Sequence, residues 1–177
     1  MAQFGRWRDA SEPQFRSGLS KDVEELLKQM GDESLVPAAE SDAFWMKREF
    51  GIDHDPSGLR CERNVFRYRP IPRVLLRASN EKDLARMCLA ASVAGCEVEL
   101  SLDPSMARPS WTKRFPIWSE SEAQLADRLR AGRHGLGLLR CDQVGAKLVE
   151  SALDEGIRLV SGAPVMNGRV EMTACFY

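Results

Sequence analysis

The feature that most constrains the fold is a regular alternation of short apolar runs and amphipathic segments between residues 73 and 161. Each segment between the runs carries apolar residues at helical spacing. Strand–helix–strand repeats of this kind predict a mostly parallel sheet with flanking helices, and their right-handed crossovers give an α/β, Rossmann-like fold. The predicted strands are 73–78 (RVLLRA), 97–102 (EVELSL), 135–140 (GLGLLR) and 157–161 (IRLVS).

Helix start signals support this alternation. Asn80 is placed to cap the first helix of the repeat, and the S-x-x-E spacing of Ser119 and Glu122 predicts a capping box. Asp142 is expected to cap the helix before the final strand. Residues 103–118 hold three prolines and two tryptophans, which predicts an excursion between a strand and a helix.

Two further helices are predicted ahead of the repeats. Ser20 can cap the first, which stops at Gly31, and an apolar stripe that stops at Gly51 marks the second. We therefore divide the chain into an N-terminal helical linker segment, residues 1–58, and a Rossmann-like α/β domain, residues 59–177. The stripe of the second helix consists of Ala39, Ala43, Met46 and Phe50.

Composition excludes several classes of protein. Hydrophobic residues make up 44% of the chain, which indicates a folded protein. Lys and Arg total 25 against 26 Asp and Glu, and this balance argues against a dedicated nucleic-acid-binding protein. The sequence shows neither an apolar run long enough to span a bilayer nor an N-terminal apolar signal, so we expect a cytoplasmic protein. The five cysteines are odd in number and lack C-x-x-C spacing, and this pattern argues against both a disulfide framework and a zinc site.

The sequence provides no catalytic, cofactor-binding or metal-binding residue that we would assign. The first strand-to-helix turn, residues 78–81 (ASNE), has no glycine for a dinucleotide phosphate. The group Asp53-His54-Asp55 is better explained as a polar turn than as a metal site, since no second histidine lies nearby. Cys141 precedes a predicted helix, but the adjacent Asp142 would raise its pKa, so inert burial is the better interpretation.

An unusual stretch, residues 61–70 (CERNVFRYRP), alternates arginine with apolar residues and ends at a proline. In an extended strand Phe66 and Tyr68 lie on one side, with Arg67 and Arg69 on the other. Alternation fits a strand with a solvated charged face, at a sheet edge or broken at Pro70. It also fits a protein interface, where arginine and aromatic residues are enriched. A single-stranded nucleic-acid groove or an anion site is a third interpretation, which the charge balance disfavours.

Three segments together resemble one family. Residues 60–70 (RCERNVFRYRP), 41–58 (SDAFWMKREFGIDHDPSG) and 167–171 (NGRVE) are similar to the C-terminal region of bacterial bifunctional proline dehydrogenase/Δ1-pyrroline-5-carboxylate dehydrogenase, the long-form proline utilisation family. The likeness extends over nearly the whole chain. It implies a degenerate aldehyde-dehydrogenase-type Rossmann domain that docks on the aldehyde dehydrogenase domain and shields the semialdehyde. The implied interface residues are Arg63, Phe66, Arg67, Tyr68, Arg69, Arg169 and Glu171.

The resemblance also implies limits. NAD and FAD serve the full-length family enzyme, and we expect neither to be bound by this chain alone. The family's closing segment starts at residues 168–171 but is cut short here, so a role in sealing the active site or contacting a second subunit does not carry over to this chain. Self-association of the chain stays open as a separate possibility. Two other functions stay open: an independent module that binds a small anion at the carboxyl edge of the sheet, and a residual NAD-dependent aldehyde dehydrogenase fragment that uses Cys141 or Cys175.

Overall fold

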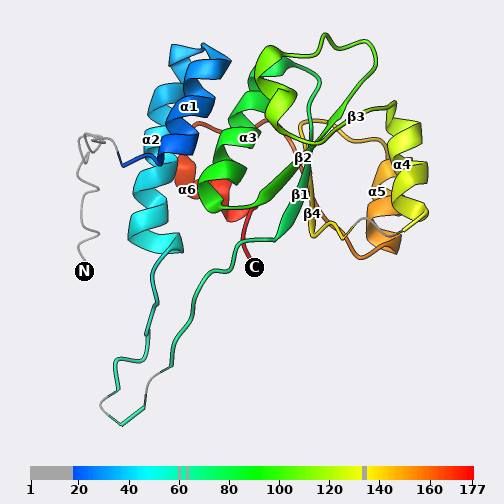
Figure 1. The fold of residues 1–177 in the computed structure, drawn as a ribbon. Coiled ribbons are helices and arrows are strands. Elements are labelled where there is room, and N and C mark those ends of the chain that lie inside the picture. Colours follow the sequence, from blue (N-terminus) through cyan, green and yellow to red (C-terminus); the bar gives the residue numbers. More distant parts are fainter. Residues whose placement is uncertain (1–17, 60, 63, 133–134) are drawn as a thin grey trace, which may run out of the picture.

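The computed structural model describes residues 18–59, 61–62, 64–132 and 135–177. Its centre is a five-stranded sheet in which every neighbouring pair is parallel, with the strand order β3-β2-β1-β4-β5 (Figure 1). This sheet, flanked by helices, confirms the predicted α/β Rossmann-like fold. The strands are β1 (Arg73–Arg77), β2 (Glu97–Leu102), β3 (Ile117–Ser119), β4 (Leu138–Cys141) and β5 (Arg158–Ser161).

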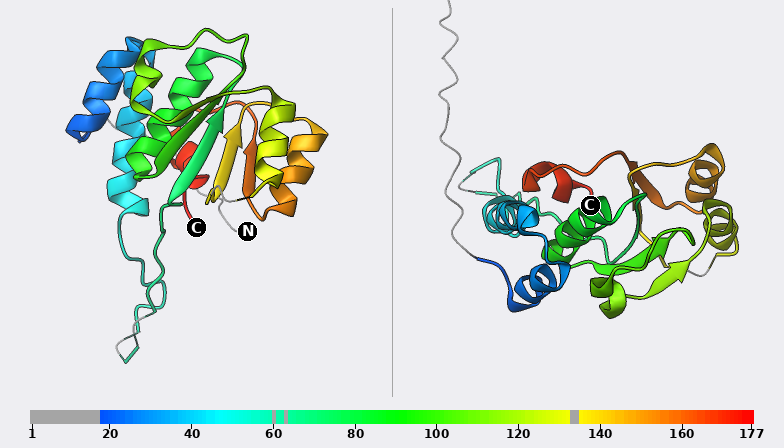
Figure 2. Two further views of the ribbon diagram at one scale, coloured as in Figure 1. Left: turned by 45° about the vertical axis from the view of Figure 1, so that its right-hand side comes forward. Right: turned by 90° about the horizontal axis from the view of Figure 1, so that it is seen from above.

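Helices cover both faces of the sheet (Figure 2). Alternate strand residues point to opposite faces, so Val74 and Leu76 join one buried cluster while Leu75 and Leu139 join another. The Val74 face is covered by α3 (Glu81–Ala94) together with α1 (Lys21–Met30), α2 (Val36–Trp45) and α6 (Gly168–Thr173). The opposite face is covered by α4 (Glu122–Arg130) and α5 (Ala146–Asp154).

The predicted caps of α1 and α3 are confirmed. The Ser20 side chain accepts a hydrogen bond from the Val23 amide, and Asn80 accepts one from Asp83. Both helices end at a glycine in the left-handed region, Gly31 and Gly95, where a side chain would be strained. The helical chain of α2 continues through a π-helical turn, Met46–Phe50, and ends at Gly51 as its apolar stripe predicts.

Two local predictions are wrong, and one strand was not predicted. The capping box of α4 is made by Ser121 and Gln124 rather than by Ser119 and Glu122. The final crossover helix begins at Ala146, and Asp142 does not cap it because its carboxylate accepts hydrogen bonds from Ser79. The excursion after β2 returns to the sheet as β3, a short edge strand that pairs with β2.

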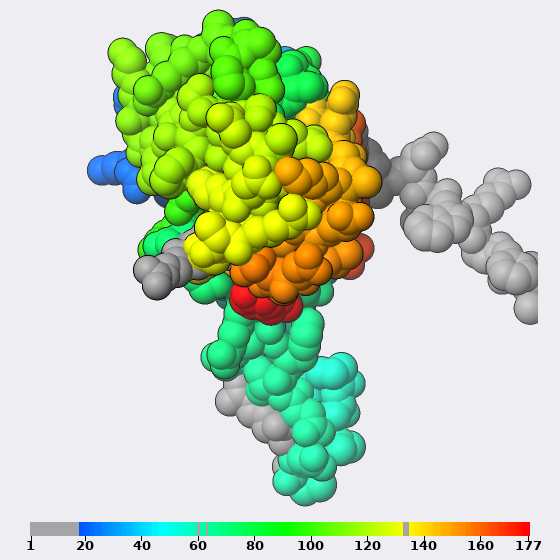
Figure 3. Space-filling model, turned by 90° about the vertical axis from the view of Figure 1, so that its right-hand side faces the viewer, coloured from blue at the N-terminus to red at the C-terminus, as the bar shows by residue number. Residues whose placement is uncertain are grey.

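Residues 51–70 form an arm that leaves the body after the π-helical turn and returns just before β1 (Figures 1 and 3). Among the described residues of the arm, the backbones of its outgoing and returning segments pair at one isolated antiparallel bridge, between His54 and Phe66. The stretch 65–69 is therefore not part of the main sheet, and Pro70 instead bridges to Phe176 near the C-terminus. No helix among the described residues is long and apolar enough to cross a membrane.

A buried ion pair fixes α2 to the rest of the body. Both guanidinium ends of Arg86, on α3, donate to the Asp42 carboxylate at 2.8 Å, and the two side chains are 2% and 0% exposed. Arg86 also donates to the Val165 carbonyl at 2.9 Å. Burial raises the pKa of the Asp42 carboxyl to about 6, although Arg86 opposes the rise. The pair is therefore costly to bury, and costlier to break once buried.

The start of α6 packs directly against the backbone of α2. The amide of Gly168 donates to the Ser41 hydroxyl at 3.0 Å. A Cβ atom at Gly168 would lie 2.5 Å from the Asp42 amide nitrogen, so only glycine permits this approach. The same segment that carries Asp42 is thus held by α3 on one side and by α6 on the other.

We predict that Asp42→Ala destabilises the protein by about 3–5 kcal/mol, because it leaves the Arg86 guanidinium buried without its anion. Replacing both partners, as Asp42→Leu with Arg86→Met, should recover most of that loss. Urea unfolding measures both effects. The control is Asp53→Ala, which removes an exposed partner of Arg67 and should cost less than about 1 kcal/mol. A loss no larger than that of the control would contradict a dominant role for the pair.

Candidate functional site

The carboxyl edge of the sheet holds a hollow of about 360 Å³ where the strand order reverses between β1 and β4. Sheets of this type usually bind ligands at this place. The end of β1, the loops after β1, β2 and β4, and the start of α4 line the hollow. The lining side chains include Arg77, Ser79, Asp103, Glu122 and Asp142.

Two carboxylates of the chain itself accept backbone amides beside the starts of two helices at this edge. Asp142 accepts from both the backbone amide (2.9 Å) and the hydroxyl of Ser79, just before α3. Glu122 accepts from the amide of Gly145, just before α5, at 3.1 Å. Amides at such positions are the ones that bind phosphate in dinucleotide sites. A pyrophosphate would have to displace two carboxylates here, so the edge does not fit NAD.

The buried cation of this edge is also satisfied internally. Arg77 donates to the Ser101 hydroxyl and the Glu120 carbonyl, each at 2.9 Å, and to the Asp103 carboxylate at 3.1 Å. Through these contacts the guanidinium holds the end of β2 and the loops after β2 and β3 together. The hollow therefore offers an incoming anion more carboxylates than unengaged positive charge, which weakens the anion-binding interpretation.

The candidate nucleophiles lie in unfavourable surroundings. Burial raises the pKa of the Cys141 thiol to about 11, and Asp142 adds to the rise. The pKa of Cys175 is raised by its hydrogen bond with Cys96 and by burial. Since the thiolate is the reactive form, neither position favours attack on an aldehyde at neutral pH.

The polar turn of the arm is engaged in local contacts. The His54 ring nitrogen Nε2 lies 2.8 Å from the Glu49 carbonyl oxygen, Asp53 pairs with Arg67, and Asp55 accepts from Ser57 and Gly58. Within the described ranges of the chain, no group of three or more His, Cys, Asp or Glu residues could hold a metal ion.

A second hollow, of about 560 Å³, lies where the arm joins the body. We call it the aromatic cup. Its walls come from the end of α2 and the π-helical turn, from both segments of the arm, and from α6. Its lining consists of Trp45, Arg48, Glu49, His54, Pro56, Phe66, Tyr68 and Arg169.

Glu49 organises the cup. It accepts two hydrogen bonds from Arg169, at 2.7 and 3.1 Å, while the Arg169 guanidinium lies 5.2 Å from the centre of the Trp45 ring. The Tyr68 hydroxyl lies 3.5 Å from the same carboxylate. The sequence alone did not point to Glu49, because its position depends on the helical turn that brings it opposite α6.

A series of ring contacts joins the cup to the core. Phe66 and Tyr68 meet edge to face with ring centres 4.9 Å apart, and Tyr68 meets Phe50 at the same separation. Phe50 then stacks on Phe176 at 4.7 Å. Such pairs stabilise beyond the area they bury, so the base of the arm is packed while its outer part is not.

The predicted interface residues divide into separate groups. Phe66, Tyr68 and Arg169 are brought together in the cup, while Arg67 lies against Asp53 at 3.0 Å. Arg69 is exposed, and its carbonyl accepts from the Tyr177 amide. Arg63 lies outside the described residues. Glu171 is instead buried in an ion pair with Arg140 of β4 at 3.0 Å, so its carboxylate is not on the surface.

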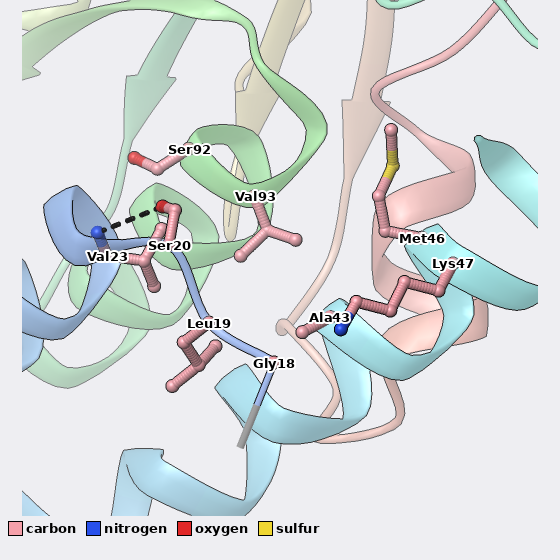
Figure 4. A pocket seen from close by; sticks show the side chains of 9 residues that line it. All are labelled: Gly18, Leu19, Ser20, Val23, Ala43, Met46, Lys47, Ser92 and Val93. Atoms are coloured by element: carbon pink, nitrogen blue, oxygen red, sulfur yellow. Dashed lines mark hydrogen bonds between the residues drawn. The ribbon is translucent and has the colours of Figure 1, made fainter. Parts of the chain in front are cut away.

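A third hollow, of about 200 Å³, lies between α1, α2 and the end of α3 (Figure 4). Its walls are mainly apolar, with Leu19, Val23 and Val93 among them. Of its polar side chains, Ser20 is already engaged in capping α1. With so few converging polar groups, this hollow gives no basis for assigning a ligand.

Comparison with known proteins places these features in context. No family model matches the chain, and no curated protein matches it. Among solved structures, the chain is similar to Proline Utilization A (PutA) from Corynebacterium freiburgense, with a TM-score of 0.62 and 27% sequence identity. The match covers 94% of this chain and 15% of that one. The similarity supports a PutA-related domain that corresponds to a small part of the larger protein.

We predict that about 1 mM NAD⁺ or about 10 mM phosphate changes the melting temperature of the protein by less than about 0.5 °C, because Asp142 and Glu122 already accept the amides of Ser79 and Gly145 beside the helix starts. Asp142→Ala should gain a phosphate-dependent rise, whereas Asp154→Ala, which removes an exposed carboxylate of α5, should not. Differential scanning fluorimetry makes the comparison. A dose-dependent rise in the unmodified protein would contradict the assignment.

Proposed function

We propose that this chain is a non-catalytic docking domain, related to the C-terminal region of proline utilization A, that packs on an aldehyde dehydrogenase domain. There it would exclude water from the path of the semialdehyde intermediate in the oxidation of proline to glutamate. The single observation that carries this proposal is the arm, which extends from the body (Figure 3). Apolar side chains and the arginines at 67 and 69 are exposed on it.

The arm buries too little apolar surface to explain its projecting conformation by its own contacts. Ile52, Leu59 and Phe66 are 43%, 53% and 50% exposed. Two-stranded ribbons are at best marginally stable alone in water. Large apolar residues gathered on such a projection mark a surface that another protein covers. A second protein body packed along the arm would supply the missing burial.

The side chains at the base of the arm suit a protein partner. Arginine and aromatic residues are enriched at interfaces and supply much of their binding energy. The cup presents Phe66 and Trp45 beside the guanidinium of Arg169, whose charge is already balanced by Glu49. A partner can therefore insert an apolar side chain beside Arg169 without leaving that charge unpaired.

The carboxyl edge supports a role without catalysis. Oxidation of an aldehyde by NAD requires a reactive thiolate and a bound dinucleotide. The thiols of Cys141 and Cys175 have raised pKa values, and Asp142 and Glu122 accept the backbone amides of Ser79 and Gly145 at the carboxyl edge. In the proposed role, the partner supplies both elements and this chain supplies the enclosing surface.

We predict that the chain binds a proline utilization A protein from which the region similar to this chain has been deleted. Phe66→Ala should weaken binding about tenfold or more, because it truncates an aromatic residue at the contact. The control is Leu153→Ala on α5, an apolar residue 66% exposed and remote from the arm, which should bind like the unmodified chain. Isothermal titration calorimetry reads both. Equal weakening by the two variants would count against docking through the arm.

We predict that the purified chain alone does not reduce NAD⁺ with pyrroline-5-carboxylate. Added to the same truncated proline utilization A, it should lower the amount of semialdehyde that an amine trap captures during proline oxidation. Absorbance at the NADH band measures the first result, and chromatography of the trapped adduct measures the second. Turnover by the chain alone that disappears in Cys141→Ala would instead support the residual-enzyme alternative.

A further inference from the structure

Two cysteines meet where the C-terminal segment crosses the start of the sheet. Cys96 lies between α3 and β2, and Cys175 lies just after α6. The Cys96 Sγ is 3.7 Å from the Cys175 carbonyl oxygen, and each thiol is the main cause of the shifted pKa of the other. Both are free thiols, and no step of the proposed function uses Cys96.

We propose that Cys96 and Cys175 form an oxidation site that closes to an intrachain disulfide when the protein meets a hydroperoxide. The inference is independent of docking, since it depends on the contact between these two side chains within a single chain. Neither residue stands alone, because the Cys96 sulfur contacts the backbone of Cys175, 79 positions further along the chain.

The surroundings make Cys96 the attacking thiol. It is half-buried, so a small oxidant can reach it, whereas Cys175 is buried behind it. The hydrogen bond from the Cys175 thiol lowers the pKa of Cys96, and the Ile71 amide assists. Burial raises the pKa of Cys88 to about 12 and that of Cys141 to about 11, which leaves those two thiols protonated.

The chemistry balances with hydrogen peroxide as the oxidant. The Cys96 thiolate attacks one peroxide oxygen, the O–O bond breaks, and hydroxide leaves and takes a proton to become water. Cys96 is then a sulfenic acid. The Cys175 sulfur attacks the Cys96 sulfur, the S–O bond breaks, and the second oxygen leaves as water. Two thiols and one peroxide give one disulfide and two waters.

The bond would tie the C-terminal segment to the body. The Cys175 carbonyl accepts from the Ile71 amide at 2.8 Å, and the next residue, Phe176, stacks on Phe50 at the base of the arm. A disulfide here closes a loop of about 80 residues, which restricts the unfolded chain strongly. The oxidised protein therefore holds the segment beneath the arm more firmly.

The test treats the full-length chain with hydrogen peroxide and follows its thiols, mass and melting temperature. We expect the loss of two of the five thiols and of the mass of two hydrogen atoms. Peptide mapping without reduction should find residues 96 and 175 linked. The melting temperature should rise by roughly 5–15 °C and return to its starting value on treatment with dithiothreitol.

Two matched variants decide the assignment. Cys96→Ser removes the attacking thiol from a half-buried position and should abolish the linkage, while Cys61→Ser, at an exposed thiol of the arm, should leave it unchanged. In Cys175→Ala, Cys96 should stop at the sulfenic acid, which dimedone captures. The proposal is overturned if both thiols stay free while Cys61 is oxidised, or if mapping links Cys96 to another residue.

Discussion

The buried ion pair between Asp42 and Arg86 is the interaction on which the rest of the structure depends. It holds α2 against α3, and the chain that leaves α2 runs without a break through the π-helical turn into the arm. Glu49 and Phe50 lie on that turn, so the cup and the ring contacts beneath it take their positions from α2. Gly168 adds a second constraint, because its missing side chain lets α6 lie against the backbone at Asp42. The parallel sheet is of a common type, and the positions of α2, α6 and the arm are fixed by these two contacts outside the sheet.

The two ends of the sheet differ in what lies against them. The arm joins the sheet through β1, so it lies at the amino ends of the parallel strands. The carboxyl ends, where sheets of this type usually bind ligands, are filled by the chain's own carboxylates and by the internal contacts of Arg77. A similarity to part of proline utilization A over 94% of the chain is consistent with a domain whose surface, rather than its sheet edge, carries the function.

Local signals in the sequence predicted the sheet and most helix boundaries, because caps and apolar periodicity act over a few residues. Asn80 is such a signal, and so is the alternation that placed Phe66 and Tyr68 on one side of their segment. Features set by distant contacts were missed. Asp142 resembles a helix cap but bonds to Ser79, 63 positions away, and Glu171 resembles a surface residue until Arg140 is brought beside it. The arm escaped prediction for the same reason, since nothing local separates a projecting ribbon from an edge strand.

The central claim is that the arm is a contact surface for a second protein body. Hydrogen–deuterium exchange of the full chain, with and without a proline utilization A protein that lacks the similar region, tests it most directly. The account predicts that protection on binding concentrates in residues 51–70 and in the walls of the cup, with residues 142–146 at the carboxyl edge unchanged. Protection confined to the carboxyl edge, or none in the arm at saturating partner, would contradict it.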